Sequence, residues 1–463
     1  MFDANIYIER RKLLKQQIKS GVILFPGNEE APMNYPANPY NFRQDSSFLY
    51  YWGLDFPGLA AIIDVDNDDE IIYGEDFSVD DIVWMGPQET MAEKAKRVGV
   101  SATSKVSALD EKIKHALRTG RRIHYLPQYR SDCLLKISQL TGVRTALVNE
   151  FASRDLIKAV VNQRSIKSAE EVEQIEKALA ISYEMNLLAM KMVKPGIYEK
   201  EVAGAIEGIV HSYSSMTSFP MIFSVHGEVL HGHSHENLMQ SGQLVVVDSG
   251  AESPLHYASD ITRTIPVSGK FDILQKDIYN IVLSAQLGAI EMMKPGVLNK
   301  TVHLHAAKIM AQGLKDIGLM KGNVDDAVAA GAHALFFPHG LGHQMGLDVH
   351  DMEGLGENFV GYDEKTTRSD QFGLAYLRYA KELQPGLVMT VEPGIYFMPE
   401  LLAQWKQQNK HKEFINYEKA EQTLGFGGIR IEDDVLITPN GNRVLGKPIP
   451  KTVAEVEAAC IAQ

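Results

Sequence analysis

Hydrophobic residues in the first third of the chain occur in short runs separated by stretches of helical period. Apolar or β-rich runs bounded by turn residues predict strands at residues 21–27, 48–54 and 59–68. Apolar residues at helical spacing predict helices at residues 93–98, 107–117 and 131–140. The polar stretch 66–69 lies between two strand-like runs, and we interpret it as a hairpin turn rather than a cation site. The pattern predicts a mixed α/β domain over residues 1–160.

A second unit begins near residue 165. Ser168 and Glu171 form a Ser-x-x-Glu capping box ahead of a long helical pattern that continues to about Val193. Lys-Pro-Gly at residues 194–196 should end this helix, because proline and glycine do not continue it. We place the domain boundary just before the helix and assign residues 165–455 to the second domain.

The second unit contains an internal repeat. LLAMKMVKPG at residues 187–196 aligns with LGAIEMMKPG at residues 287–296, and SGQLVVVDSG at 241–250 aligns with PGLVMTVEPG at 385–394. In the second pair a strand-like run ends in an acidic residue, which is Asp248 or Glu392. Two echoes in the same order predict a duplicated helix-then-strand half-domain. Such a fold would bring Asp248 and Glu392 together at a pseudo-twofold axis.

Composition excludes several classes of function. Hydrophobic residues make up 45% of the chain and charged residues 23%, as in an ordinary globular protein. The 46 Lys and Arg against 59 Asp and Glu give a net charge of −13, which argues against nucleic acid and membrane partners. There are two cysteines, Cys133 and Cys460, and neither a signal-peptide core nor the ~20-residue apolar stretch of a membrane span. We therefore expect a cytoplasmic protein.

Residue types that bind metals gather in four segments of the second unit. The candidate residues are Asp248 and Asp260, His339, His343 and His350, Glu392, and Arg430 with Glu432. A carboxylate inside a β-branched run is costly to bury unless it is paired or metal-bound, so Asp248 and Glu392 indicate function. His339 and His350 are as readily interpreted as core histidines. Four carboxylates and one imidazole suit two Mn²⁺ or Mg²⁺ ions, which can activate water and polarise a carbonyl.

These motifs resemble the aminopeptidase P and prolidase family. The resemblance rests on HGLGHQMGLDVHD, VMTVEPGIYF, GGIRIEDDVLIT and DSGAE…YASDITRT, with YNFRQDSSFLYYWGLDFPG similar to the family's N-terminal domain. It implies an α/β (α+β) architecture, in which the mixed α/β domain precedes a pseudo-twofold pita-bread (creatinase/aminopeptidase-like) catalytic domain. It also implies hydrolysis of Xaa-Pro bonds in peptides with proline second, and a homodimer or higher oligomer.

Residue by residue, the resemblance implies a full set of site residues. The metal ligands would be Asp248, Asp260, His343, Glu392 and Glu432. They would hold two divalent ions, usually Mn²⁺, with Co²⁺ and Zn²⁺ as alternatives. Glu392 would also carry a proton to the leaving amine. His231, His339 and His350 match substrate-binding and catalytic histidines, and Arg430 matches an arginine that orders the site.

Two questions stay open at this level. A strict Xaa-Pro dipeptidase holds the free carboxylate of its substrate, and Arg378 resembles the arginine that does so; an aminopeptidase P accepts longer peptides. Phe219 stands where the family usually has tyrosine, and Asp248 and Asp260 are one residue farther apart than usual. An inactive peptide-binding relative is the alternative from another class. Such relatives typically lose metal ligands, whereas this chain has all five.

Overall fold

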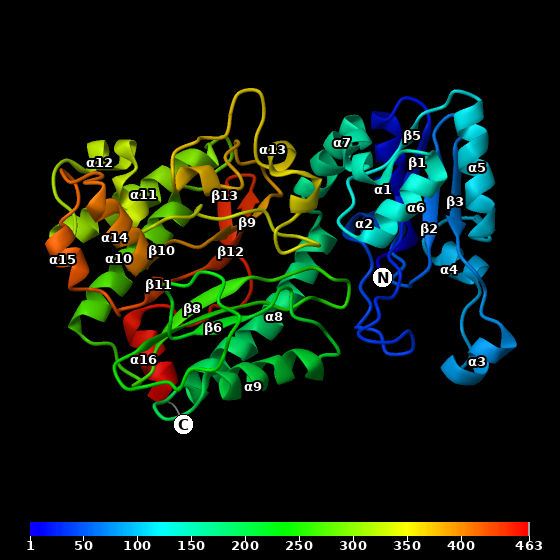
Figure 1. Ribbon diagram of the computed structural model, residues 1–463. Helices are drawn as coiled ribbons and strands as arrows, with labels where there is room; N and C mark the ends of the chain where they lie inside the picture. The colour runs from blue at the N-terminus through cyan, green and yellow to red at the C-terminus, as the bar shows by residue number, and fades with distance from the viewer. Residues whose placement is uncertain (462–463) are drawn as a thin grey trace. The chain divides into compact units, whose positions relative to one another are not determined.

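The computed structural model describes residues 1–461 and divides the chain into two compact units. The first holds residues 1–164 together with 352–359, and the second holds 165–351 and the described residues from 360 onward (Figure 1). The elements of the first unit are α1 Ala4–Gln17, β1 Val22–Pro26, α2 Ser46–Trp52, β2 Ala60–Asp64, β3 Asp69–Tyr73, α3 Val79–Met85, α4 Met91–Arg97, β4 Ala102–Ser104, α5 Ser107–Arg118, β5 Ile123–His124, α6 Ser131–Thr141, η1 Thr145–Leu147, η2 Asn149–Phe151, α7 Arg154–Ser165 and η4 Glu353–Leu355.

The first unit is built on a five-stranded mixed sheet in the order β4-β3-β2-β1-β5. β2 and β3 form an antiparallel hairpin in which Asp64 pairs with Asp69, so the predicted turn at residues 66–69 is confirmed. The predicted strands at 21–27 and 59–68 correspond to β1 and β2, and the three predicted helices to α4, α5 and α6.

The predicted strand at residues 48–54 is wrong, because this segment belongs to helix α2. The Asp45 side chain accepts a hydrogen bond from the Phe48 N–H at the start of the helix, and Gly53 ends it with φ of 60°. All seven residues of α2 are buried. A helix buried on every side has no polar stripe, so its aromatic sequence resembles a buried strand.

The second unit carries two similar halves. Its elements are α8 Ala169–Met192, α9 Glu199–Ser212, β6 Ile222–Ser224, β7 Leu244–Ser249, β8 Ile261–Pro266, α10 Ile273–Met292, α11 Asn299–Asp316, α12 Val324–Ala330, η3 Ala332–Leu335, α13 Glu357–Val360 at the unit boundary, η5 Leu374–Tyr376, β9 Val388–Val391, β10 Gly394–Tyr396, α14 Pro399–Gln407, α15 Tyr417–Glu421, β11 Gly428–Arg430, β12 Asp433–Thr438, β13 Gly441–Val444 and α16 Val453–Ile461.

The internal repeat predicted from the sequence appears as two matching helix–strand arrangements. α8 begins at the predicted capping box, and α8 and α10 end at the equivalent residues Met192 and Met292. Gly196 and Gly296 follow them with φ of 89° and 88°, values that glycine adopts without strain. α8 and α9 pack on the sheet β6-β7-β8, while α10 packs on β9, β10 and β11 and carries α11 (Figure 1).

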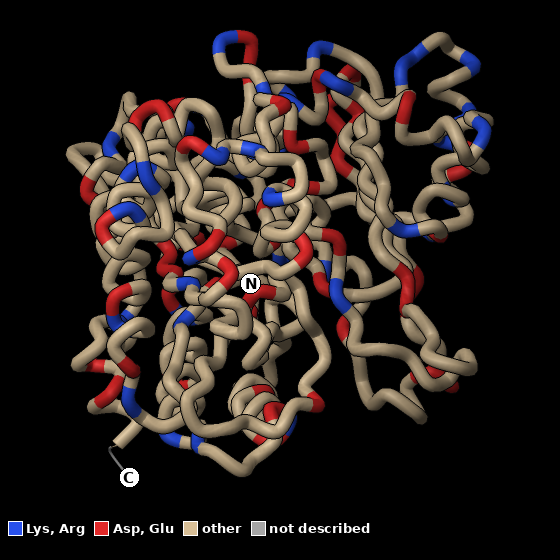
Figure 2. The backbone as a smooth tube through the Cα atoms, turned by 60° about the vertical axis from the view of Figure 1, so that its left-hand side comes forward, with Lys and Arg blue, Asp and Glu red and all other residues tan. Residues whose placement is uncertain are grey.

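Charge is distributed over both units. Figure 2 shows Lys and Arg interspersed with Asp and Glu along the described chain, so the negative charge is not gathered in one block. Among residues 1–461, none of the helices combines the length and apolarity that crossing a membrane requires.

Candidate active site

A cavity of about 630 Å³ in the second unit brings all ten sequence-predicted site residues together. It is lined by His231, Asp248, Asp260, His339, His343, His350, Arg378, Glu392, Arg430 and Glu432. Both halves of the repeat contribute. Asp248 lies on β7 and Asp260 directly precedes β8, whereas Glu392 directly follows β9 and Glu432 lies between β11 and β12. Apolar side chains, among them Phe219 and Phe372, complete the wall.

His343 lies among the carboxylates with its Nε2 turned toward them. Its Nε2 is 3.4 Å from Asp260 Oδ2 and 3.5 Å from Glu392 Oε1. Its Nδ1 lies 3.0 Å from the Gln344 carbonyl oxygen and donates to it, which leaves the Nε2 lone pair facing the carboxylates. Asp260, His343 and Glu432 each offer one ligand atom within 4.8 Å of the others.

Glycine is required beside His343 for the loop to reach the strand. A Cβ on Gly342 would lie 2.0 Å from the Thr390 carbonyl oxygen on β9. This close approach lets the His343 N–H donate to Thr390 Oγ1 at 3.0 Å. The HGLGH motif is therefore fitted to β9 as well as to its chemistry.

The cavity carboxyl groups carry more negative charge than the protein balances. Burial, together with the neighbouring acidic groups, raises the pKa values of Asp260 and Glu432 well above their usual range. Burial also raises the pKa of Glu392 to about 8, and the charge of Asp248 adds to this effect. Asp248 Oδ1 and Asp260 Oδ1 are buried and have no hydrogen-bond partner among residues 1–461. These groups offer hard oxygen ligands, and the positive charge nearby does not balance their negative charge. Such a set fits divalent cations.

Arg430 partly balances this charge and connects the two halves. It is 4% exposed, and its Nη2 lies 2.5 Å from Asp248 Oδ2. Its Nε donates to Thr262 Oγ1 at 3.1 Å, and that hydroxyl donates to Glu432 Oε2 at 2.6 Å. Arg430 and Glu432 therefore face the same side, as their spacing on a strand predicts.

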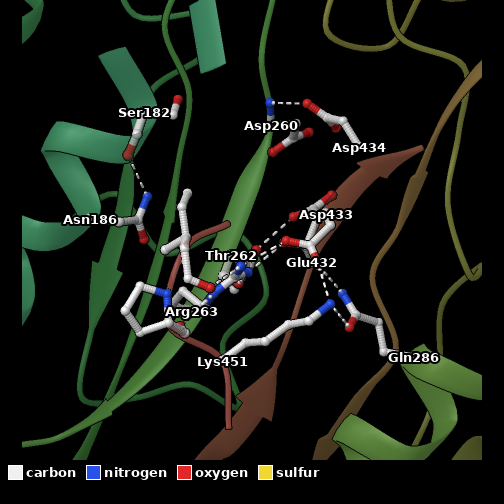
Figure 3. A network of polar contacts seen from close by, with 12 residues as sticks. Ser182, Asn186, Asp260, Thr262, Arg263, Gln286, Glu432, Asp433, Asp434 and Lys451 are labelled. Carbon is white, nitrogen blue, oxygen red and sulfur yellow. Dashed lines mark hydrogen bonds and ion pairs between the residues drawn. The ribbon is translucent and has the colours of Figure 1, made fainter. Parts of the chain in front are cut away.

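A polar network supports the carboxylates from behind (Figure 3). Asp434 Oδ2 accepts the Asp260 N–H at 3.1 Å, and Arg263 Nη1 donates to the Glu432 carbonyl oxygen at 2.6 Å. Arg263 Nη2 also donates to Asp433 Oδ1 at 2.7 Å. Asp433 Oδ2 accepts from Lys451 at 2.7 Å and from Gln286 at 2.9 Å. Burial pushes the Asp433 pKa upward, but Arg263 and Lys451 outweigh it and hold the pKa below its usual value.

The three predicted histidines outside the ligand set have different surroundings. His339 uses both ring nitrogens, at 2.8 Å from the Gly340 carbonyl oxygen and 2.8 Å from the Tyr396 hydroxyl. Burial and then Arg430 lower the His339 pKa to about 3, so its ring is neutral. The His350 ring stacks edge-on against the His343 ring with centroids 4.3 Å apart. His231 lines the cavity, where desolvation and then the charge of Arg430 lower its pKa.

Sequence reasoning missed four polar residues that hold the predicted ones. They are Thr262, Thr390, Tyr396 and Asp434. The Thr390 hydroxyl bonds to Glu392 Oε1 at 3.2 Å, and the Tyr396 hydroxyl joins His339 to Arg430 Nη1 at 2.9 Å. Thr262, Thr390 and Asp434 each lie two positions from a predicted ligand. The period-2 alternation of a strand was the signal that could have found them.

Comparison with known proteins places this arrangement among peptidases. A family model described as metallopeptidase family M24 matches residues 173–439, and one for the aminopeptidase P N-terminal domain matches residues 7–124. The Xaa-Pro dipeptidase of Homo sapiens is 34% identical over 453 residues, covering 95% of this chain and 88% of its own. The Xaa-Pro aminopeptidase of Escherichia coli K12 is 30% identical over 473 residues, covering 98% and 97%.

Solved structures agree with the sequence matches. Zinc-substituted Escherichia coli aminopeptidase P in complex with product superposes with a TM-score of 0.80 at 27% identity, covering 100% of this chain and 99% of that one. An aminopeptidase of Pseudomonas aeruginosa gives a TM-score of 0.80 at 27% identity, covering 100% and 98%. The predicted fold class, a mixed α/β domain followed by a pseudo-twofold pita-bread domain, is confirmed.

Proposed function

The chain belongs to metallopeptidase family M24, and from that premise we propose that it hydrolyses the bond between an N-terminal residue and proline. The observation that carries the proposal is the meeting of four carboxyl groups and His343 in one cavity. Relatives named Xaa-Pro dipeptidase and Xaa-Pro aminopeptidase match nearly the whole chain. The Xaa-Pro amide nitrogen has no hydrogen, so a site that acts on the carbonyl and the attacking water suits this bond.

Membership of a metallopeptidase family implies divalent metal ions. We propose that two ions are held by Asp248, Asp260, His343, Glu392 and Glu432, and that Mn²⁺ is the native metal. When bound, the ions supply Lewis acidity toward water and the scissile carbonyl. Two observations support this ligand set: the raised pKa values of Asp260 and Glu432, and the buried Oδ1 atoms of Asp248 and Asp260, which accept no hydrogen bond from residues 1–461.

Glu392 is the proposed proton carrier. It is the most accessible of the four carboxyl groups, with 18% of its side chain exposed, so it can reach water and substrate. It receives the proton of the attacking water and delivers it to the proline nitrogen as that nitrogen leaves. The Thr390 hydroxyl, 3.2 Å from Glu392 Oε1, fixes the orientation of the carboxyl group.

The remaining residues orient the substrate and the ligands. Arg430 holds Asp248 and, through Thr262, Glu432. His231 and His350 line the cavity and are proposed to contact the peptide. His339, proposed from the sequence as a third substrate-binding histidine, has both ring nitrogens bonded within the protein. Its contacts favour a role in holding Tyr396 and, through it, Arg430.

Strict dipeptidase activity is the more specific form of the proposal. Arg378 lines the same cavity as the metal-ligand candidates, where a guanidinium can bind the carboxylate of a dipeptide. Its charge also contributes, after burial and Arg430, to the low pKa of His231.

We further propose residues 165–455 as the catalytic domain, a homodimer or higher oligomer, and a cytoplasmic location. The last is supported by two cysteines without a disulfide.

Hydrolysis of Gly-Pro against Gly-Pro-Ala by the Mn²⁺-loaded protein tests this function. A dipeptidase cleaves Gly-Pro and leaves the tripeptide largely intact. Arg378→Ala should then lose about 30- to 1000-fold in kcat/KM for the dipeptide, the scale of one partner lost from a charge pair. Cleavage of both peptides at rates insensitive to Arg378→Ala would identify an aminopeptidase P instead. Cleavage of neither would refute the proposal.

A further inference from the structure

The two halves of the catalytic unit use equivalent residues to hold the chain segments that carry His231 and Arg378. Glu199 and Asn299 are each the first residue of a helix, α9 and α11, and each stands three positions after the glycine of a repeated Lys-Pro-Gly. Their side chains are almost fully buried, at 0% and 2% exposure. Neither residue lines the cavity.

The backbone around the two residues is paired in the same way. Gly196 N–H donates to the Met239 carbonyl oxygen at 2.9 Å, and Gly296 N–H donates to that of Leu383 at 2.9 Å. Likewise Glu199 N–H donates to the Asn237 carbonyl oxygen at 3.0 Å, and Asn299 N–H to that of Lys381 at 2.9 Å. The repeat therefore extends from the helices to the segments that follow the cavity residues.

In the first half, Glu199 holds both ends of one loop. We call residues 225–237 the His231 loop, since His231 stands six positions from either end. Glu199 Oε1 accepts the Val225 N–H at 2.7 Å, and Oε2 accepts the Asn237 N–H at 3.2 Å and its Nδ2 at 3.0 Å. One buried carboxyl group thus joins the two ends of the loop whose middle residue, His231, lines the cavity.

In the second half, Asn299 holds the segment that follows Arg378. We call residues 378–382 the Arg378 segment. Asn299 Nδ2 donates to the Tyr379 carbonyl oxygen at 2.8 Å, directly after Arg378. The hydrogen-bonding role is reversed: Glu199 accepts from backbone N–H groups, whereas Asn299 donates to a backbone carbonyl oxygen. An acceptor in one half and a donor in the other explains why the repeat differs at this position.

We propose that Glu199 and Asn299 are positioning residues, equivalent under the internal repeat, that fix His231 and Arg378 over the cavity. The role of each for catalysis rests on the proposed Xaa-Pro hydrolysis, while the anchoring itself does not. A buried group left without its partner costs its full desolvation free energy, so substitution should release the segment rather than leave it in place.

Isosteric substitutions test the proposal, with hydrogen exchange as the first measurement. Glu199→Gln should speed amide exchange at least tenfold in the His231 loop, and Asn299→Asp should do so in the Arg378 segment, each without effect on the other segment. Glu201→Gln removes an exposed carboxyl that accepts the Tyr198 N–H on the same helix, and Asn416→Asp removes a similar amide–carbonyl bond to Gly318. Both controls should leave the two segments unchanged. Unchanged exchange in Glu199→Gln and Asn299→Asp, or faster exchange throughout the unit, overturns the anchoring.

Double-variant kinetics on Gly-Pro provide the second measurement. Each anchor variant should lose about 10- to 100-fold in kcat/KM. Glu199→Gln should add less than about twofold to His231→Ala, and Asn299→Asp less than about twofold to Arg378→Ala, because each pair acts through one residue. Multiplying losses would overturn the positioning role. Cleavage of neither Gly-Pro nor Gly-Pro-Ala by the wild-type protein would refute the proposed function, while hydrogen exchange still decides the anchoring.

Discussion

Glu432 and Asp433 are neighbours in sequence and similarly buried, at 2% and 5% exposure. Their pKa values are nevertheless shifted in opposite directions. Glu432 faces the cavity, where burial and the charges of Glu392 and Asp248 raise its pKa well above the usual range. Asp433 faces the other way, where Arg263 and Lys451 lower its pKa despite burial (Figure 3). Successive side chains of an extended segment point to opposite sides, so these two adjacent residues lie in different electrostatic environments.

The difference shows which buried charge the protein neutralises itself. Asp433 has a guanidinium, an ammonium and an amide within 2.9 Å, so its charge is matched by donors from the fold. The cavity carboxyl groups have each other as neighbours, with Arg430 in direct contact with Asp248. We call the side on which these carboxyl groups meet the cavity face. An uncompensated buried charge costs several kcal/mol, so the cavity face is suited to cations from outside the chain.

Glu392→Gln should produce the largest change, because it removes the proposed proton carrier from the cavity face. We expect kcat/KM to fall by about 10²- to 10⁴-fold in the metal-reloaded protein, while folding is kept. Glu400→Gln makes the same chemical change at an exposed position on α14 and should have wild-type activity. Substantial turnover by Glu392→Gln after reloading would remove Glu392 from this role.

We call the side where Asp433 contacts Arg263 and Lys451 the supporting face. Asp433→Asn should leave positive charge on this face without its carboxylate partner. It leaves the buried Arg263 without its carboxylate, and we expect the free energy of unfolding to fall by about 3–5 kcal/mol. Glu432→Gln in the metal-free protein should instead be neutral or stabilising, since it removes one of several like charges. Urea denaturation in EDTA measures both. Equal destabilisation by the two substitutions would abolish the distinction between the faces.

Metal should stabilise the protein through the cavity face. Mn²⁺ at 100 times its dissociation constant should add about 2.7 kcal/mol to the free energy of unfolding of the wild-type protein. Asp260→Asn should lose most of this gain, because it removes a carboxylate at the centre of the cluster. Urea denaturation with and without Mn²⁺ provides the comparison, and an equal gain in the variant would place the metal elsewhere.

The two faces should also respond oppositely to pH, with a smaller effect. The folded-state pKa of Glu392, about 8, lies above its ordinary 4.5, so the folded protein binds more protons over that interval. Stability of the metal-free protein should therefore fall as pH rises from about 4.5 to 8. The lowered pKa of Asp433 has the reverse effect, and its contribution should be lost as pH falls below its ordinary value. Mn²⁺ should remove the first dependence only; a slope unchanged by Mn²⁺ would contradict the assignment.

Asp248 and Glu392 could be predicted to be functional because charged residues inside β-branched runs have few structural explanations, whereas the complete ligand set was implied by the family resemblance. The repeat added that Asp248 and Glu392 should meet. Thr262 and Thr390 were not found because a hydroxyl on a strand is ordinary, although each lies two positions from a predicted ligand. Tyr396 was not found because only its contacts with His339 and Arg430, which are distant in sequence, reveal its role. The fold was predicted equally well where polarity marked the elements. The prediction was wrong at α2, where burial on all sides left no helical period in the pattern of apolar and polar residues.

Counting bound Mn²⁺ by equilibrium dialysis tests the central claim most directly. The claim is that the cavity carboxyl groups form a cation site that the fold leaves unneutralised. EDTA-treated wild-type protein should bind two Mn²⁺ per chain, as should Asp110→Asn, in which an acid on the exposed face of α5 is replaced. Asp260→Asn should bind at most one. No bound Mn²⁺ in the wild type, or two in Asp260→Asn, would contradict the account.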